Sequence, residues 1–339
     1  MIYDLVVIGN GLAAQVFLHT LFTNVNKSQN YSVAQIFSEE LAPACSLRST
    51  ASVSLSGIEE GISELGDELS KSFFYFEEFY RTHSPAGIES IEQYVAAFSE
   101  RENEKNQRRY KHLDDLTHPF FIKSLRGKKL QSYIVSPEQL TQWFEDKLET
   151  FPLKRLRHFV QSVSKKTDDL NECHLLGGEK VFAKKILFCT GAYAKIHAQF
   201  FGMDKTLERT QVVAGSFLER SVDLNCDSFY FTLDGHNLIY RKSDHKLILG
   251  SVSTKGAIAS ADFLELAQLL EFFKTLLNLP LGEMSDFFVT TGLRHKGIKR
   301  RPFYQALDAD NRLFLMSGLY KNGYSFPYYV AHVMLKKIL

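Results

Sequence analysis

The 339-residue sequence has few cysteines and a single tryptophan, Trp143. Its four cysteines, Cys45, Cys173, Cys189 and Cys226, form no CxxC pair and lie far apart, which argues against a zinc site or a disulfide framework. We therefore predict no metal site, and a reducing cytoplasm is the simplest location for the protein.

The sequence also lacks an excess of charge and a long apolar run. Lys and Arg number 40 against 39 Asp and Glu, so the chain as a whole gives no electrostatic case for binding nucleic acid or an acidic membrane. No stretch reaches the roughly 18 uninterrupted apolar residues of a transmembrane helix. The N-terminus carries Asp4 and two glycines where a signal peptide would have basic and then apolar residues, so we predict none.

Phenylalanine and tyrosine are abundant, with 28 and 15 residues. This aromatic content favours large buried cores or an apolar pocket. At roughly 150 residues per domain, the length of the chain is typical of about two domains.

The first 37 residues have the pattern of a βαβ unit. Residues 2–8 form a β-branched apolar run that ends at glycine, which predicts a buried strand. Helical spacing of apolar residues predicts a helix over 11–23, and a second β-like run covers 32–37. Strand, glycine turn, helix and strand in this order predict a parallel sheet.

The turn between that strand and helix has the sequence G-x-G-x-x-A, from Gly9 to Ala14. Gly9 would allow the tight turn, Gly11 would let the backbone approach a pyrophosphate, and Ala14 would let helix and strand pack closely. The start of the helix, with Leu12 and Ala13, would offer free amides and a positive dipole end to the phosphates. We therefore predict dinucleotide binding; the alternative is a purely structural glycine turn.

The end of the second predicted strand departs from this motif. An acidic residue that bonds the ribose is expected there, but Ser38 occupies the position and Glu39 follows it. Because a serine hydroxyl can also bond a ribose hydroxyl, we assign both residues to the cofactor site. The alternative is that Glu39 only marks a solvated strand end.

The rest of the chain alternates between helical and β-like patterns. Helices are predicted over residues 67–80, 99–116, 137–149, 261–278 and the C-terminal end. Strands are predicted at 88–98, 157–164, 172–177, 185–191, 211–218, 228–233, 237–242, 246–251 and 312–316. Segments with a β-α pattern lie at the start, around 137–195 and at the end of the chain, and segments that look like antiparallel strands lie between them. This arrangement predicts two interleaved domains.

Several segments, in a fixed order, carry a resemblance to a known family. They are the turn at 9–14, the run 136–140 followed by 158–160, the strand 186–193, and the segments 291–294 and 317–324. On these segments the chain resembles the D-amino-acid-oxidase-type FAD-dependent oxidoreductases, a group that includes glycine oxidase and sarcosine oxidase. The region 234–251 is similar to the antiparallel substrate sheet of that family.

The resemblance implies a fold and its domains. The fold would be α/β, with a Rossmann-like FAD-binding domain on a parallel sheet, interleaved with an antiparallel-sheet (α+β) substrate domain. The FAD-binding domain would comprise residues 1–83, 136–207 and 291–339. The substrate domain would comprise 84–135 and 208–290 and would roof the flavin.

The resemblance also implies a site for FAD. Val160 would present its backbone to the adenine, while Gly318 and residues 322–324 would lie against the flavin ring. Some members of the family attach FAD to a cysteine in this C-terminal segment, which has none here, so we expect noncovalent FAD. The residues assigned to the cofactor in this way are Thr50, Ala51, Val160, Thr190, Gly191, Gly318, Asn322, Gly323 and Tyr324.

Three residues are assigned to the substrate. The family's Gly-Leu-Arg arginine binds a substrate carboxylate, and it falls on Arg294, whose guanidinium could bond a carboxylate bidentately. Lys321 replaces a family arginine and keeps its charge without its fork geometry. Tyr240 is a candidate pocket residue, as is Tyr230. The alternative for Arg294 is an ion pair at the surface or between domains.

Two segments depart from the family. Residues 45–52 lack the glycine of the family's turn after the second strand, and Arg300 and its neighbours replace an acidic residue. Between 294 and 301, six of eight residues are basic or can become so. They would form either a solvated loop or a surface for a polyanionic substrate or an acidic partner. A single loop is too small a footprint for us to expect nucleic acid.

The resemblance implies an enzyme. We expect oxidation of the C–N bond of an amino acid or a related amine that carries a carboxylate, with hydride passing to flavin N5. One alternative is an FAD-dependent 2-hydroxy-acid dehydrogenase, which would need a general base near N5. Another is a catalytically weak nucleotide-binding subunit of a larger complex. We expect a small carboxylate substrate and no membrane, and leave open a partner subunit or a homo-oligomer.

Overall fold

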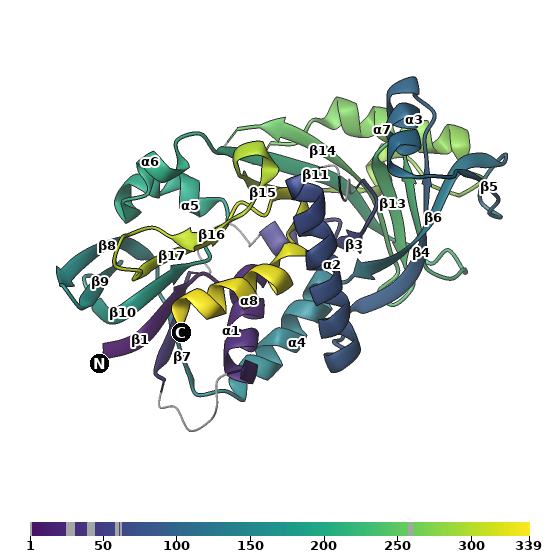
Figure 1. The fold of residues 1–339 in the computed structure, drawn as a ribbon. Helices are drawn as coiled ribbons and strands as arrows, with labels where there is room; N and C mark the ends of the chain where they lie inside the picture. The colour runs from purple at the N-terminus through teal and green to yellow at the C-terminus, as the bar shows by residue number, and fades with distance from the viewer. Residues whose placement is uncertain (1, 25–30, 39–44, 58–60, 62, 257–259) are drawn as a thin grey trace.

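The computed structural model contains two β-sheets, and the chain passes between them several times (Figure 1). The residues that the structure describes are 2–24, 31–38, 45–57, 61, 63–256 and 260–339. In Figure 1 the first sheet lies at the lower left, with the two chain ends, and the second lies at the upper right.

The first sheet is parallel at its centre. Its middle strand is β1 (Ile2–Ile8), and β10 (Lys180–Phe188) and β2 (Val33–Phe37) pair with it on either side. β17 (Leu313–Ser317) extends the sheet beyond β10, and β7 (Leu153–Arg157) extends it beyond β2. β1 forms here because a nearly continuous apolar run can be buried on both faces, as an inner parallel strand requires.

Antiparallel strands extend the first sheet, and helices pack on it. β16 (Phe303–Ala306) pairs with β17, β9 (Leu170–Leu175) pairs with β10, and β8 (Val160–Thr167) pairs with β9. Apolar stripes of four helices merge with one face of the sheet into a single core. These helices are α1 (Leu12–Asn24), α2 (Glu64–His83), α4 (Pro137–Glu149) and α8 (Phe326–Ile338). The other face is covered by β8, β9 and the short helices α5 (Tyr193–Ile196) and α6 (Asp204–Leu207).

The second sheet is antiparallel except where β4 and β12 run side by side in parallel. Its strands, in spatial order, are β15 (Phe288–Lys296), β11 (Gln211–Ser221), β14 (Lys246–Lys255), β13 (His236–Arg241), β12 (Phe229–Leu233), β4 (Ile88–Ala96), β6 (Leu125–Val135) and β3 (Ser52–Ser54). The leucines and phenylalanines of α7 (Phe263–Leu276) pack on one face of this sheet.

The predicted α/β fold class is confirmed, and one predicted helix is wrong in its second half. The helix expected over 99–116 ends early, because α3 (Glu100–Arg109) is followed by β5 (Asp114–Leu116), which pairs with β6. β6, β7, β15 and β16 were not predicted. β6 was missed because charged residues interrupt its first half, and its pairing with β4 and β3, far away in sequence, decides its conformation.

The two sheets do not follow the predicted domain boundaries strand by strand. β3 belongs to the second sheet although it lies within 1–83, and the boundary expected at 290/291 falls inside β15. The division of the chain into domains by residue stays a prediction.

Candidate functional site

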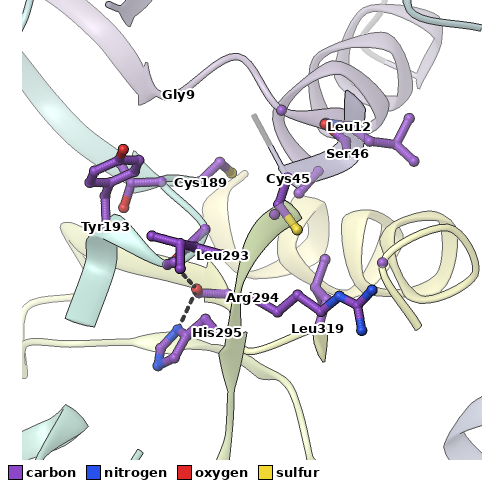
Figure 2. A pocket seen from close by; sticks show the side chains of 18 of the residues that line it. Gly9, Leu12, Cys45, Ser46, Cys189, Tyr193, Leu293, Arg294, His295 and Leu319 are labelled. Carbon is purple, nitrogen blue, oxygen red and sulfur yellow. Dashed lines mark hydrogen bonds between the residues drawn. The ribbon is translucent and has the colours of Figure 1, made fainter. Parts of the chain in front are cut away.

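A cavity of about 370 Å³ is lined by residues of both sheets. The first sheet contributes the carboxyl ends of β1, β2, β10 and β17, which is where open parallel sheets bind their ligands. The second sheet contributes Asn237, Ser251 and the stretch 291–295. In Figure 2, Gly9 and Leu12 lie on one side of this space and Arg294 and His295 on the other.

The turn that follows β1 depends on Gly9. Gly9 has a φ of 124°, and a Cβ there would overlap the carbonyl oxygen of Cys189, so only glycine fits. The Gly9 amide donates to the carbonyl oxygen of Ile36 at 2.8 Å, which ties the turn to β2. Five residues of the motif line the cavity: Gly9, Asn10, Gly11, Leu12 and Ala13. Ala14 is fully buried in the core around α1, where the motif expects close packing.

A polar network that was not predicted supports this turn. Gln35 Nε2 donates to the carbonyl oxygen of Gly9 and to Asn10 Oδ1, at 2.9 Å each. Arg155 Nε donates to Gln35 Oε1 at 3.0 Å, and the guanidinium forms an ion pair with Glu145. The sequence carried one signal of this network, because Gln35 is a polar residue in the middle of an otherwise apolar strand.

The residues assigned to the adenosine end lie at the same cavity. Ser38 and Val160 line it, together with His158 and Phe159, which connect β7 to β8. Of the residues 158–160, which were expected to lie in a strand, only Val160 does so, as the first residue of β8. Glu39 lies outside the residues that the structure describes.

Most of the other residues assigned to the cofactor also line the cavity: Thr50, Ala51, Thr190, Gly191, Gly318, Gly323 and Tyr324. Asn322 is not among the lining residues. The Tyr324 hydroxyl donates to the carbonyl oxygen of Ser46, and Ser46 Oγ accepts from the Leu12 amide at 3.3 Å. Tyr324 thus holds the segment around η1 (Cys45–Leu47) in place, although this segment lacks the family's glycine.

Arg294 is buried at the cavity, with 6% of its surface exposed. Its guanidinium lies against the backbone of Gly215 on the neighbouring strand β11, and its charge acts on the Cys45 thiol. Burial raises the pKa of that thiol, and the Arg294 charge partly offsets the rise. Arg48 lines the same space and donates to the Thr291 carbonyl oxygen at 3.3 Å. Neither Cys45 nor Arg48 was assigned to the site from the sequence.

Lys321 lies in η5 (Tyr320–Asn322) and is among the residues that line the cavity. Its pKa is lowered by the protein that surrounds it and by three nearby cations, Arg294, Arg300 and Lys296. No described carboxylate forms an ion pair with Lys321. The site therefore holds unneutralised positive charge.

The structure corrects the placement of Tyr240. This residue is fully buried in the core between the second sheet and α7 and does not line the cavity. Strand alternation explains the error, because Tyr240 points to the α7 side of β13 while Asn237 points to the other. Tyr230 is also buried, and its hydroxyl lies 3.0 Å from Ser52 Oγ.

The basic run at 294–301 is not one continuous charged loop. It begins on β15, where Arg294 and His295 are buried. Arg301 forms ion pairs with Glu64 and Glu68 of α2, and Lys296 lies over the Tyr320 ring. The remaining basic residues, Lys299 and Arg300, are exposed.

His295 connects three segments of the site. Its Nδ1 lies 2.7 Å from Ser317 Oγ and its Nε2 lies 2.9 Å from Thr210 Oγ1, while Ser317 donates to the Gly191 carbonyl oxygen at 3.0 Å. Burial, with a smaller effect of Lys195, lowers the pKa of His295 to about 4. The imidazole is thus held between two hydroxyl groups as a fixed hydrogen-bonding unit.

In the described part of the chain, no helix has both the length and the apolar character needed to cross a membrane. The same residues include no group of three or more His, Cys, Asp or Glu side chains that could hold a metal ion.

Comparisons with known proteins identify the fold. No protein-family model and no curated protein matches the sequence. Among solved structures, glycine oxidase from Geobacillus kaustophilus is similar at 16% identity, a TM-score of 0.78 and 99% coverage of this chain and 94% of that one. FAD-bound L-alpha-glycerophosphate oxidase from Mycoplasma pneumoniae is similar at 14% identity, a TM-score of 0.79 and coverages of 100% and 95%.

A third solved structure is iminodiacetate oxidase from Chelativorans sp. BNC1, at 15% identity, a TM-score of 0.79 and coverages of 98% and 94%. The chain thus has the fold of these oxidases over its whole length. The fold that the resemblance implied, an FAD-dependent oxidoreductase fold, is confirmed. At this level of sequence identity the comparisons show the fold alone. The function must therefore be argued from the site.

Proposed function

We propose that this protein is an FAD-dependent oxidoreductase that oxidises the C–N bond of an amine carrying a carboxylate. The observation that carries the proposal is the buried Arg294 guanidinium in the cavity that begins at the Gly9 turn. Two of the similar structures are named for an amino acid and an amino dicarboxylate, glycine and iminodiacetate, and a third has FAD bound.

The lining of the cavity fits FAD at three points. A Cβ at Gly191 or Gly323 would meet no protein atom within 4 Å, so both backbones border open space. Thr190 Oγ1 is buried without a hydrogen-bond partner among the described residues, and a bound cofactor would supply one. In the first turn of α1 the Leu12 amide already donates to Ser46 Oγ, and the Ala13 amide, at the cavity, can donate to a pyrophosphate, as amides at helix N-termini do.

The residues of the chain would then act mainly by binding and orienting. Arg294 would bond the substrate carboxylate in two places, and its burial strengthens those bonds. Fixing the carboxylate restricts where the neighbouring carbon can lie, and such positioning is a large part of catalysis. Bound FAD would supply the hydride acceptor, and water would then convert the product imine to a carbonyl compound and an amine.

The 2-hydroxy-acid alternative has less support, because removing an alcohol proton calls for a general base. No Asp or Glu is among the described residues that line the cavity. His295 is the nearest base to Arg294 in the sequence, and both of its ring nitrogens already lie within hydrogen-bond distance of hydroxyl oxygens. An amine that arrives neutral needs no such base.

The visible absorption spectrum of the purified protein tests the proposal first. We expect flavin bands that move to the supernatant after acid precipitation, as for noncovalent flavin, and chromatography should identify FAD. Anaerobic mixing with amino acids should bleach those bands, and 2-hydroxy acids should leave them unchanged. A colourless protein that takes up no added FAD would contradict the flavoenzyme and favour a binding subunit. A partner subunit, a homo-oligomer and a cytoplasmic location stay predictions.

A further inference from the structure

His295 follows Arg294 on β15, and the two side chains leave the strand in opposite directions (Figure 2). Arg294 lies over Gly215 of β11, whereas His295, which is 3% exposed, is bonded to β17 and to the segment that follows α6. The Phe303 ring of β16 stacks on the imidazole, with ring centres 6.1 Å apart and planes 9° apart. The imidazole is therefore held in one orientation, on the far side of the strand that carries the proposed carboxylate-binding residue.

The hydroxyl of Ser317 joins this imidazole to the turn that follows β10. Ser317 Oγ donates to the Gly191 carbonyl oxygen at 3.0 Å and lies 2.7 Å from His295 Nδ1. Because a serine hydroxyl has one proton, its contact with Nδ1 must use a lone pair, so Nδ1 carries a proton and donates it. If Ser317 donated to Nδ1 instead, the Gly191 carbonyl would be left with the longer bond from the Ala194 amide, at 3.3 Å.

The other ring nitrogen has a partner that can either donate or accept. His295 Nε2 lies 2.9 Å from Thr210 Oγ1, which is also 2.7 Å from the Leu207 carbonyl oxygen. That carbonyl accepts as well from the Lys195 ammonium at 2.9 Å and from the Thr210 amide at 3.0 Å. The Thr210 proton can therefore turn to Nε2 when the ring is neutral, and the carbonyl stays bonded. Nδ1 keeps its proton whichever charge the ring carries.

The bonds on the Nδ1 side lead to two turns that line the cavity. Gly191 and Gly318, with φ of 56° and 76°, are the lining residues of these turns that the family resemblance assigns to FAD. A backbone bridge between Lys296 and Leu319 also joins β15 to the second turn. The strand is therefore attached, directly behind Arg294, to both turns.

We propose that His295 is a positioning residue: its Nδ1–H bond to Ser317 fixes the strand of Arg294 relative to the two turns assigned to FAD. The proposal rests on the proposed function, because it concerns the distance between a carboxylate on Arg294 and bound FAD. His295 would not touch the reacting atoms. Since the rate of reaction depends steeply on how the reacting groups are placed, loosening this connection should slow flavin reduction more than it weakens carboxylate binding.

Nitrogen NMR of the FAD-loaded protein, with isotope-labelled histidine, tests the hydrogen-bond assignment without turnover. We expect one imidazole with a proton on Nδ1 that exchanges slowly with solvent, and its signals should be missing from His295→Asn. A His295 ring with a proton on Nε2 and none on Nδ1 would overturn the proposal.

A matched pair of variants separates the Nδ1 bond from packing. The amide of His295→Asn lies near the position of Nδ1 and can still donate to Ser317. The amide of His295→Gln lies near the position of Nε2, so it reaches Thr210 and loses Ser317. Both side chains are polar and uncharged, and asparagine is the smaller one. A defect confined to His295→Gln therefore cannot come from lost volume or lost charge.

The expected result is a split between rate and affinity. Both variants should bind FAD, and butyrate in calorimetry, within about threefold of the wild type, because Arg294 keeps its contact with Gly215. Anaerobic reduction of the flavin by saturating glycine or iminodiacetate should slow about tenfold to a hundredfold in His295→Gln and stay near the wild-type rate in His295→Asn. The change that butyrate causes in the flavin bands makes the same comparison without turnover, and its amplitude should differ from the wild type only in His295→Gln.

Ser317→Ala completes a double-mutant cycle. If His295 acts through the Ser317 hydroxyl, His295→Gln should slow flavin reduction little further in the Ser317→Ala background. Additive losses of rate would show that the two residues act separately and would overturn the positioning role.

Two further results would contradict it: equal slowing of flavin reduction in the asparagine and glutamine variants, or a loss of FAD and butyrate affinity in His295→Gln as large as its loss of rate. Failure of the proposed function shows itself differently, as a wild-type protein that takes up no FAD or whose flavin no amine reduces. The NMR measurement also works on flavin-free protein, and the butyrate spectrum needs no turnover, so the two failures are distinguishable.

Discussion

The guanidinium of Arg294 on β15 lies on the backbone of Gly215 on β11, where a Cβ would come within 2.6 Å of its Nε and Nη2 atoms. Gly215 pairs across the strands with Gly292, and a Cβ at Gly292 would meet Arg48 and Cys45. The two paired glycines thus form a floor for the cationic side of the site. The Arg294 guanidinium can lie here only because Gly215, on the neighbouring strand β11, has no side chain.

We predict that Gly215→Ala displaces Arg294 without removing it. Binding of a monocarboxylate such as butyrate should weaken roughly tenfold to a hundredfold, because a charge-assisted hydrogen-bonded pair is worth about 1.5–3 kcal/mol. The flavin content should stay at the wild-type level, since Gly215 does not line the cavity. Calorimetric titration and the absorption spectrum measure the two quantities.

A double-mutant cycle with Arg294→Met separates displacement from general damage. If Gly215→Ala acts through the guanidinium, it should have little further effect on binding in the Arg294→Met background. Additive losses of affinity in the double variant would show that the alanine disturbs the site in another way.

Gly9→Ala should abolish FAD binding. The positive φ alone costs about 1–3 kcal/mol for a residue with a side chain, and the new Cβ would also overlap the Cys189 carbonyl oxygen. Flavin content per chain, from the visible spectrum, measures the effect. Gly202→Ala is the matched control, with a φ of 66° and no protein atom near its Cβ, so it should retain flavin. Equal flavin loss in both variants would assign the effect to backbone strain alone.

Thr190→Val should have opposite effects on the two forms of the protein. In the flavin-free form it removes a buried hydroxyl that has no partner among the described residues, so the melting temperature should rise or stay unchanged. In the flavin-bound form it removes a bond to the cofactor, so the dissociation constant for FAD should increase about twofold to tenfold. An unchanged FAD affinity would mean that Thr190 does not bond the cofactor.

Stability should fall on acidification between about pH 6.5 and pH 4. Burial lowers the pKa of His295 to about 4, and burial, with smaller effects of His83 and Lys147, lowers that of His19 to about 4. In the unfolded chain these histidines titrate near 6.5, so below that pH the unfolded state binds protons that the folded state does not. The loss should be roughly 2 kcal/mol per histidine by pH 5 in urea unfolding.

His19→Phe tests this assignment. The His19 ring lies among aromatic rings, including Trp143 and Phe144, so a phenyl ring suits its surroundings. The variant should lose less stability than the wild type between about pH 7.5 and pH 5. Identical losses in the two proteins would show that His19 does not contribute to the acid sensitivity.

The sequence alone determined the glycine turn at 9–14 and the elements around it. Strand, turn and helix from residue 2 to 24 follow from local rules: an apolar run, a backbone angle that only glycine tolerates, and helical spacing. Helix 137–149 was predicted to the residue, because proline at its start and a regular apolar stripe are equally local signals. Arg294 and Lys321 were found through a family resemblance, which also acts on short segments.

Only the tertiary structure decided which side chains meet. Tyr240 and Asn237 stand three residues apart on one strand, yet one is core and the other lines the cavity, because pairing with β12 and β14 fixes which face each presents. The contact between Arg294 and Gly215 joins strands almost eighty positions apart, and no local pattern encodes it. Such relationships depend on long-range register, whose free energy comes from burial across the whole sheet rather than from any one segment.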